Sequence, residues 1–461
     1  MRKRICVLGL CLWALCLVTA CKKGDTAQAG GGDFSGRTLD ILFMVGGQGQ
    51  MADPVIEKLK SLYPGLTVNI VYDHNAADIL RNRILAGNPP DIFDVNATFF
   101  DKYSAISDGV MKPIDFLYDV PCVDDPSKTL KDVMNFSVMT FGYVDGTYYC
   151  VPDSVYTSGL WYDAKMFRDR GYKVPETWDE FAALGATAKA DGKYLLAYST
   201  RYGGEYFGNY WFYPLLCSID INAFGKIQKL EPNAYSDPAV VKTLTLTKEL
   251  LDKGYIDAVS GTLDITETQM EFCNGNVLFY ACGSWLEAEM AGNWPDGFEL
   301  TYLPFPPQKA GEPSYTPVMG VESSISAVTK NEDIVKEYYR HLLSDKEVTT
   351  KVIETTLNGL GVADFAQNYG HLLPSSVSSS WAPLDSGRCI GVSPLADSFY
   401  AAIIEATTDN SSAFNAGRMS VQQYIDAMNR TCDAIRADSS IIKRPYDMSA
   451  LMEAVAQYKA Q

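Results

Sequence analysis

The stretch that decides the fold is residues 39–96, LDILFMVGGQGQMADPVIEKLKSLYPGLTVNIVYDHNAADILRNRILAGNPPDIFDVN. Its apolar run at 39–45 is typical of a strand that is buried on both faces. Strand patterns recur at 66–72 and 91–96, and an amphipathic helix pattern fills each gap between strands. This β-α-β-α-β order predicts an α/β fold with a doubly wound, mostly parallel sheet flanked by helices.

The glycines after the first strand resemble a nucleotide-binding loop. Residues 47–52, GQGQMA, match the G-x-G-x-x-A fingerprint, and Asp73 follows about twenty residues later. In that fold the helix must begin at the glycines to hold a pyrophosphate. Here Pro54 indicates a later start, and Asp53, which we expect to cap the helix, would repel an anion. The loop is better suited to close approach by a neutral ligand, and we predict no cofactor.

The alternation of strands and helices continues to the end of the chain. A capping box is expected at Thr177, before a helix at 181–189. The remaining expected strands are 155–162, 195–199, 277–281 and 324–328, and the remaining expected helices are 76–86, 164–170, 238–253, 334–344 and a last one from Ser420 to Ile435.

Composition excludes several classes of function. The 461 residues carry a formal charge of −17 and no basic block, which argues against nucleic acid. None of the three histidines lies at metal-ligand spacing to another, so no metal site is predicted. No serine-hydrolase elbow, zinc-protease or P-loop motif is present. The tyrosine doublets at 148–149 and 338–339 could ligate ferric iron, but such doublets are common in cores.

The N-terminus carries an export signal. Residues 1–20, MRKRICVLGLCLWALCLVTA, combine a basic start with a short apolar run, which is typical of a cleaved signal peptide; a short membrane anchor is the alternative. Residues 17–21, LVTAC, resemble the lipobox of bacterial lipoproteins, which implies cleavage before Cys21 and acylation of that residue. Residues 21–36 then form the lipidated cysteine and a glycine-rich tether. Export with a lipid anchor predicts a location at the periplasmic or extracellular face of the envelope.

Cleavage changes the formal charge and the number of cysteines in the mature chain. Removing the three positive charges of residues 1–20 takes the formal charge from −17 to about −20. Seven cysteines remain beyond Cys21, an odd number without paired spacing. We expect most of them to be buried free thiols.

Four further stretches resemble the maltose-binding-like family of extracellular solute-binding proteins that serve sugar-type ABC importers. They are LAGNPPDIFDVNA (85–97), GTYYCVPDSVYTSGLWYDAKMFRDRGYKVPETWDEF (146–181), MEFCNGNVLFYACGSWLEAEM (270–290) and PVMGVESSISAVTKNEDIVKEYYRHLLS (317–344). The resemblance implies a two-lobed fold with a hinge, each lobe a mixed, mostly parallel sheet flanked by helices. It places the N-terminal lobe at 37–152 and 318–370 and the C-terminal lobe at 153–317 and 371–461.

In the first lobe, ligand-binding residues are expected where strands end. Ligands of open α/β sheets bind at the carboxyl ends of the strands. That position selects Gly47 and Gln48 after the first strand, Asp73 after the second and Asn96 after the third. Amide and carboxylate groups there can hydrogen-bond sugar hydroxyls, although ordinary loop polarity would look the same.

In the second lobe, aromatic residues are expected to bind the flat faces of a sugar. Seven aromatic residues fall within 202–213, and we expect most of them to lie in the core; from them we select Tyr210 and Trp211. The resemblance implies that Trp285 stacks on sugar, although a half-buried structural tryptophan is the alternative. It also places Tyr156 and Ser158 at the first crossing between lobes. Glu322 follows the returning crossing, where it could either contact the ligand or form an ion pair at the hinge.

The sequence therefore predicts a monomeric binding protein, not an enzyme. It would capture a mono- or oligosaccharide by hinge closure and deliver it to an ABC permease, attached to the lipid bilayer through Cys21. The segment GSWLEAEM (283–290) is similar to the branch of the family that binds N-acetylated sugars. The alternatives are an exported carbohydrate-active enzyme and a receptor for a polyamine or peptide.

Overall fold

The computed structural model describes residues 32–44, 50–73, 75–95, 102–135, 142–144, 146–257 and 263–460. By their contacts, residues 34–461 form one compact unit. Among the described helices, none is both long and apolar enough to cross a bilayer.

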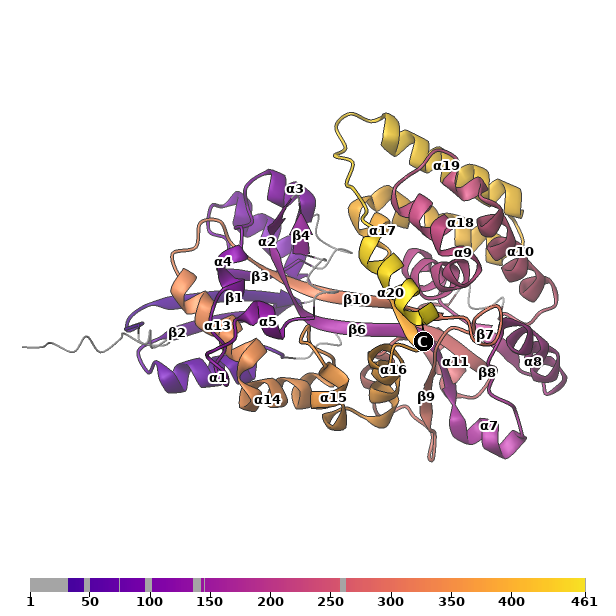
Figure 1. Cartoon of the computed structure of the whole chain (residues 1–461), viewed down its shortest axis with the longest axis horizontal. Helices are drawn as coiled ribbons and strands as arrows, with labels where there is room; N and C mark the ends of the chain where they lie inside the picture. Colours follow the sequence, from indigo (N-terminus) through magenta and orange to yellow (C-terminus); the bar gives the residue numbers. More distant parts are fainter. Residues whose placement is uncertain are drawn as a thin grey trace, which may run out of the picture. The chain divides into compact units, whose positions relative to one another are not determined.

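The strands and helices alternate along the chain (Figure 1). The strands are β1 (Thr38–Met44), β2 (Thr67–Asp73), β3 (Ile92–Asp94), β4 (Tyr143–Val144), β5 (Thr147–Tyr148), β6 (Cys150–Asp163), β7 (Tyr194–Ala197), β8 (Val277–Gly283), β9 (Leu300–Leu303), β10 (Ser314–Ile325) and β11 (Cys389–Val392). The helices are α1 (Asp53–Leu62), α2 (Ala76–Leu85), α3 (Lys102–Ser107), α4 (Asp115–Tyr118), α5 (Leu130–Val133), α7 (Ala164–Arg170), α8 (Trp178–Ala190), η2 (Gly204–Phe212), α9 (Tyr213–Gln228), η3 (Ala234–Ser236), α10 (Pro238–Asp252), α11 (Ile265–Cys273), α12 (Leu286–Glu289), α13 (Glu332–Ser344), α14 (Lys346–Thr356), α15 (Phe365–Tyr369), η5 (Gly370–Leu372), α16 (Ser375–Asp385), α17 (Leu395–Phe399), α18 (Ala401–Asn415), α19 (Val421–Ala437) and α20 (Ser449–Ala460).

Two long strands connect the halves of one mixed sheet, whose order is β2-β1-β3-β10-β6-β8-β7. β1 pairs in parallel with β2 and β3, and β7 pairs in parallel with β8. β6 and β10 are antiparallel to each other: β10 reaches β3 at one end, and β6 reaches β8 and β9 at the other. The two central strands run side by side between the halves (Figure 1).

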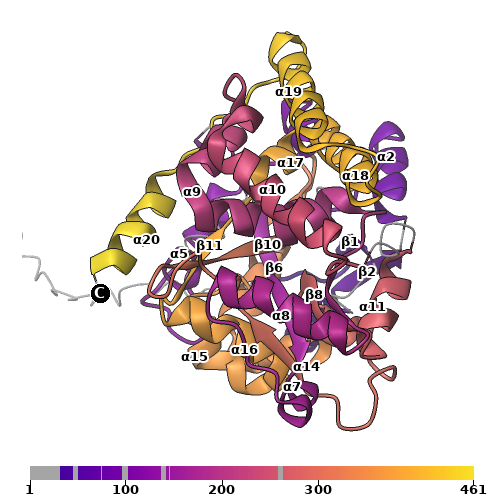
Figure 2. The same cartoon turned by 90° about the vertical axis from the view of Figure 1, so that its right-hand side faces the viewer.

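The hydrophobic core is divided in the same way. Successive residues of β1 face opposite sides of the sheet, so Ile41 and Phe43 enter a cluster with α1, α13 and α14, while Leu42 enters a smaller cluster with α2. A third and larger cluster gathers around β8, α8, α9 and α10. Figure 2 shows α9 and α10 on one side of β6 and β8, with α7 and α8 on the other. Each half of the sheet is therefore covered by helices.

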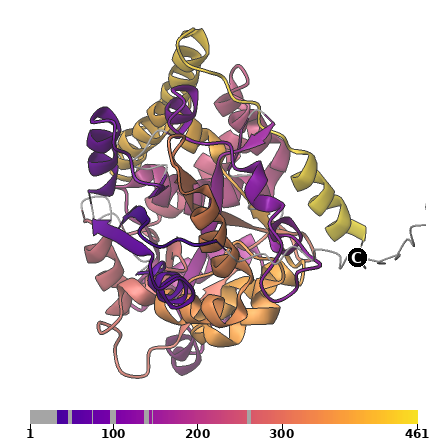
Figure 3. The same cartoon turned by 90° about the vertical axis from the view of Figure 1, so that its left-hand side faces the viewer.

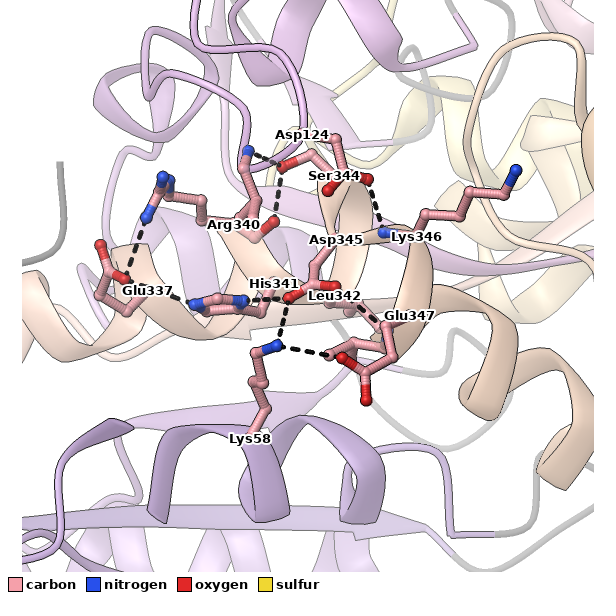
Figure 4. Close-up of polar contacts among 12 residues, drawn as sticks. Lys58, Asp124, Glu337, Arg340, His341, Leu342, Ser344, Asp345, Lys346 and Glu347 are labelled. Carbon is pink, nitrogen blue, oxygen red and sulfur yellow. Dashed lines mark hydrogen bonds and ion pairs between the residues drawn. The ribbon is translucent and has the colours of Figure 1, made fainter. Parts of the chain in front are cut away.

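A polar network joins helices that are distant in the sequence. Lys58 of α1 lies 3.3 Å from both Asp345 and Glu347, at the start of α14. His341 Nδ1 lies 2.7 Å from Asp345 Oδ2, and Arg340 donates to Glu337 (Figure 4). Figure 3 shows the indigo helix α1 next to the orange helices of this region. The network fixes the packing of α1 on α13 and α14.

The expected elements are largely confirmed, with three corrections. α1 begins at Asp53, but Ala52 is the N-cap, and Asp53 instead accepts a hydrogen bond from Tyr72 Oη at 3.1 Å. The capping box at Thr177 is only half formed, because the Glu180 side chain accepts from the backbone N–H of Glu176. The strand expected at 324–328 ends at Ile325, where pairing with β3 also ends.

Candidate functional site

The candidate site is centred on Trp285, just beyond the carboxyl end of β8. Its ring folds back against the backbone of Gly283, where a Cβ atom would come within 2.0 Å of the ring. The GSW sequence is therefore needed locally, because only glycine leaves room for the indole at this point. The ring is partly exposed, which leaves it surface for a ligand.

Two tyrosines hold the Trp285 ring from different elements. Tyr156 of β6 meets it edge to face, with centroids 5.4 Å apart and planes at 84°, and Tyr210 of η2 meets it at 5.6 Å and 64°. Both tyrosines are buried, so they position the indole. We call Tyr156, Tyr210 and Trp285 the aromatic wall; its geometry suits the face of a sugar ring.

A π-helix adds a carboxylate to the aromatic wall. In η2 each turn closes between residues five apart, which brings Glu205 and Tyr210 together. Tyr210 Oη donates to Glu205 Oε1 at 2.6 Å. Burial raises the pKa of Glu205, and the hydrogen bond from Tyr210 opposes that rise. Glu205 retains a second oxygen that can accept a hydrogen bond from a ligand hydroxyl or amide.

Buried hydroxyls lie beside the aromatic wall. Ser158 pairs with Gly283 across β6 and β8, and the Ser284 backbone N–H donates to Thr157 O at 2.8 Å. The hydroxyls of Ser158 and Ser284 are buried and have no hydrogen-bond partner among the described residues. Buried polar groups are normally paired, so these hydroxyls are candidates to bind a ligand or water.

On the β3 side of the central strands, the carboxylates Asp153 and Glu322 and the lysine Lys102 are buried, and a third carboxylate, Asp94, is partly exposed. Asp94 Oδ2 accepts from the Met44 backbone N–H at 2.8 Å, and burial raises the pKa of Asp94 to about 7 against the effect of that bond. Burial and the charge of Asp94 raise the pKa of Asp153 well above its usual range, although Ser323 donates to it. This group lies where β1 and β3 end, as expected for a binding edge.

Lys102 of α3 forms a buried ion pair with Glu322 of β10. Burial lowers the pKa of Lys102, but the charge of Glu322, the neighbouring Tyr103 and Cys150, and the hydrogen bond to Glu322 together outweigh it, and the pKa is raised. An ion pair was one of the two alternatives for Glu322, and ligand contact by Glu322 stays a prediction. Glu322 Oε1 nevertheless has no hydrogen-bond partner among the described residues.

Of the other predicted residues, four cannot be placed and Asp73 lies at the end of β2. Gly47, Gln48, Asn96 and Cys21 lie outside the described residues. Asp73, at the end of β2, accepts from the Asn75 backbone N–H at 2.7 Å.

Trp211, like Tyr210, is completely buried. It packs on Trp178 and Phe305, and its Nε1 donates to Thr247 at 3.0 Å. These are the contacts of a core residue.

Four residues of this region were not selected from the sequence: Glu205, Asp94, Asp153 and Lys102. Asp94 precedes Asn96 by two positions at the same strand end, so the strand-end rule could have found it. The other three carry no local signal. Among the described residues, no group of three His, Cys, Asp or Glu side chains is placed to hold a metal ion.

Comparisons with known proteins agree on one family. A family model described as bacterial extracellular solute-binding protein matches residues 47–349. The diacetylchitobiose binding protein NgcE of Streptomyces coelicolor is 25% identical over 437 residues, covering 89% of this chain and 88% of that protein. The multiple sugar-binding protein of Streptococcus mutans is 23% identical, covering 74% of this chain and 78% of that protein.

Solved structures give the same fold. Apo RafE from Streptococcus pneumoniae matches with a TM-score of 0.67 at 20% identity, covering 88% of this chain and 99% of that one. A chitin oligosaccharide binding protein matches with a TM-score of 0.64 at 19% identity, covering 84% and 94%.

Proposed function

The chain belongs to the family of bacterial extracellular solute-binding proteins, and from that premise we propose that it captures a carbohydrate beside Trp285 and delivers it to an ABC permease. The observation that carries the proposal is the aromatic wall, with an indole held over Gly283 by two tyrosines. The family makes the chain a binding protein and not an enzyme.

The proposed ligand is a mono- or oligosaccharide with N-acetyl groups. Similarity to a diacetylchitobiose binding protein over most of both chains supports this class. Around the aromatic wall, Glu205 offers an acceptor for an amide N–H or hydroxyl, and Ser158 and Ser284 offer hydroxyls.

The proposed mechanism is closure of two lobes about the central strands. The lobes would comprise 37–152 with 318–370, and 153–317 with 371–461. The division of the hydrophobic core on either side of β6 and β10 supports this arrangement. Trp381 of α16 packs in the cluster with α1, α13 and α14, although 371–461 belongs to the second proposed lobe. The helix α16 would therefore lie at the boundary between the two lobes.

A sugar panel tests the proposal. Purified protein is heated with N,N′-diacetylchitobiose, longer chitin oligosaccharides, raffinose, galactose and spermidine. We expect a sugar to raise the melting temperature, because a ligand at a hundredfold excess over Kd stabilises the folded protein by about 2.7 kcal/mol. Trp285→Ala should abolish this shift. Trp294→Ala is the matched control, since Trp294 is also partly buried but packs on Phe298. A shift with spermidine and with no sugar would reject the carbohydrate class.

We also propose that the chain is lipid-anchored to the envelope through Cys21. Feeding cells an alkyne-labelled fatty acid should label the wild-type protein and place it in the membrane fraction. Cys21→Ala should lose both the label and the membrane association. Label that persists in the variant would contradict acylation at Cys21.

A further inference from the structure

Tyr103 of α3 contacts residues from the far end of the chain. Its ring meets Phe399, at the end of α17, edge to face with centroids 4.8 Å apart. The guanidinium of Arg444 lies 4.7 Å from the centroid of the same ring. Both contacts involve described side chains, and Tyr103 and Arg444 are both buried. We call Tyr103, Phe399 and Arg444 the clasp.

Each end of the clasp is fixed to a different part of the sheet. On one side, Lys102, the neighbour of Tyr103, is ion-paired with Glu322 of β10, close to where β10 pairs with β3. On the other side, the Arg444 backbone N–H donates to Tyr400 Oη at 2.8 Å, and Tyr400 belongs to the large core around β8. The clasp therefore joins the β3 side of the central strands to the β8 side.

The chemistry of the clasp is suited to a contact that can open. A cation over an aromatic face and one edge-to-face ring pair are modest interactions that need no covalent or metal link. In a protein that closes over its ligand, any contact made in the closed arrangement shifts the population toward it.

We propose that the clasp sets ligand affinity by stabilising the closed arrangement, with Tyr103 as a positioning residue that acts without touching the ligand. This inference rests on the proposed lobe closure. Weakening the clasp should lower the fraction of molecules in the closed, binding-competent arrangement, and the apparent affinity for the ligand should fall by the same factor. From the usual strength of such contacts, the expected loss is roughly fivefold.

Distances measured without ligand test the clasp directly. Spin labels at Lys60→Cys on α1 and Thr245→Cys on α10 use exposed positions on either side, whereas the seven native cysteines that the structure describes are buried. We expect Tyr103→Ala and Arg444→Ala to shift the distance distribution to longer values. Tyr103→Phe, which keeps the ring, should retain the wild-type distribution.

Matched controls are Tyr143→Ala and Arg418→Ala, which truncate an exposed tyrosine and an exposed arginine. Circular dichroism checks that each variant folds. If Arg444→Ala does not fold, Arg444→Gln is measured in its place. Unchanged distances in the Tyr103 and Arg444 variants would overturn the clasp.

Binding of N,N′-diacetylchitobiose separates this inference from the proposed function. If the sugar binds, the clasp variants should bind it roughly fivefold more weakly. Equal affinity would overturn the inference. If no sugar binds the wild type, the proposed function fails, and the ligand-free distances still decide whether the clasp exists.

Discussion

The indole of Trp285 lies so close to Gly283 that a Cβ atom at position 283 would be 2.0 Å from the ring. The glycine therefore fixes where the aromatic surface stands, and Tyr156 and Tyr210 fix its tilt. The candidate site depends on backbone space as much as on side-chain chemistry.

Gly283→Ala should displace Trp285 and weaken sugar binding by at least tenfold, because the indole cannot keep its position beside an added methyl group. Titration followed by tryptophan fluorescence measures the loss. Gly370→Ala is the control, since its Cβ would meet only Ala366 at 3.7 Å. Wild-type affinity in Gly283→Ala would contradict this role for the glycine.

Glu205→Gln should weaken sugar binding by about 1.5–3 kcal/mol, the usual range for a hydrogen bond to a charged group. The amide keeps the shape of the side chain and can still accept from Tyr210, so the fold should be preserved. Calorimetric titration of the variant and of Glu249→Gln, an exposed control on α10, makes the comparison. Equal affinity in the two variants would remove Glu205 from the site.

Asp94 should make the stability depend on pH between about 4 and 7. Burial raises the pKa of Asp94 to about 7 in the folded state, so the folded protein holds a proton that the unfolded chain has released. The stabilisation is complete below about pH 4 and is lost as the pH rises through 7. Asp94→Asn should flatten this part of the profile in urea unfolding from pH 4 to 8. An unaltered slope would show that another group causes this pH dependence, and Asp153 would be the first to examine.

Asp345 should act in the opposite direction. Burial alone would raise the pKa of Asp345, but hydrogen bonds from His341, the Val348 backbone N–H and Lys58 outweigh it and lower the pKa (Figure 4). Its contribution is therefore present above about pH 4 and is lost as the pH falls further. Asp345→Asn should be less stable than wild type at pH 7 and should lose less stability on acidification. Thermal unfolding from pH 2 to 7 checks this, and a parallel profile for the variant would contradict it.

Local patterns predicted much of the fold. Hydrophobic periodicity placed β1, β2, α2 and α7 to within one or two residues, because each pattern reflects burial of one face or both. The side chain of Asp163 caps α7, accepting from the Lys165 backbone N–H at 2.9 Å. The family resemblance is confirmed by the family model over residues 47–349. The expected buried thiols are confirmed as well, since all seven described cysteines are buried and none is in a disulfide.

The candidate site was less predictable because it depends on contacts between distant segments. The π-helix η2 was not expected: Gly203 and Gly204 let it approach Ser411 and Ile404, a packing that no local pattern encodes. With that geometry Tyr210 faces Trp285 and Trp211 packs on Trp178, and both rings are fully buried. Glu205 is one of 56 acidic residues, and only the fold brings it to the aromatic wall.

The most direct test of the account is calorimetric titration of N,N′-diacetylchitobiose into the wild-type protein and into Trp285→Ala. We expect saturable binding of one sugar per wild-type chain and loss of that binding in the variant, with Trp294→Ala unchanged. Equal binding by Trp285→Ala and the wild type would contradict the assignment of the aromatic wall as the ligand site.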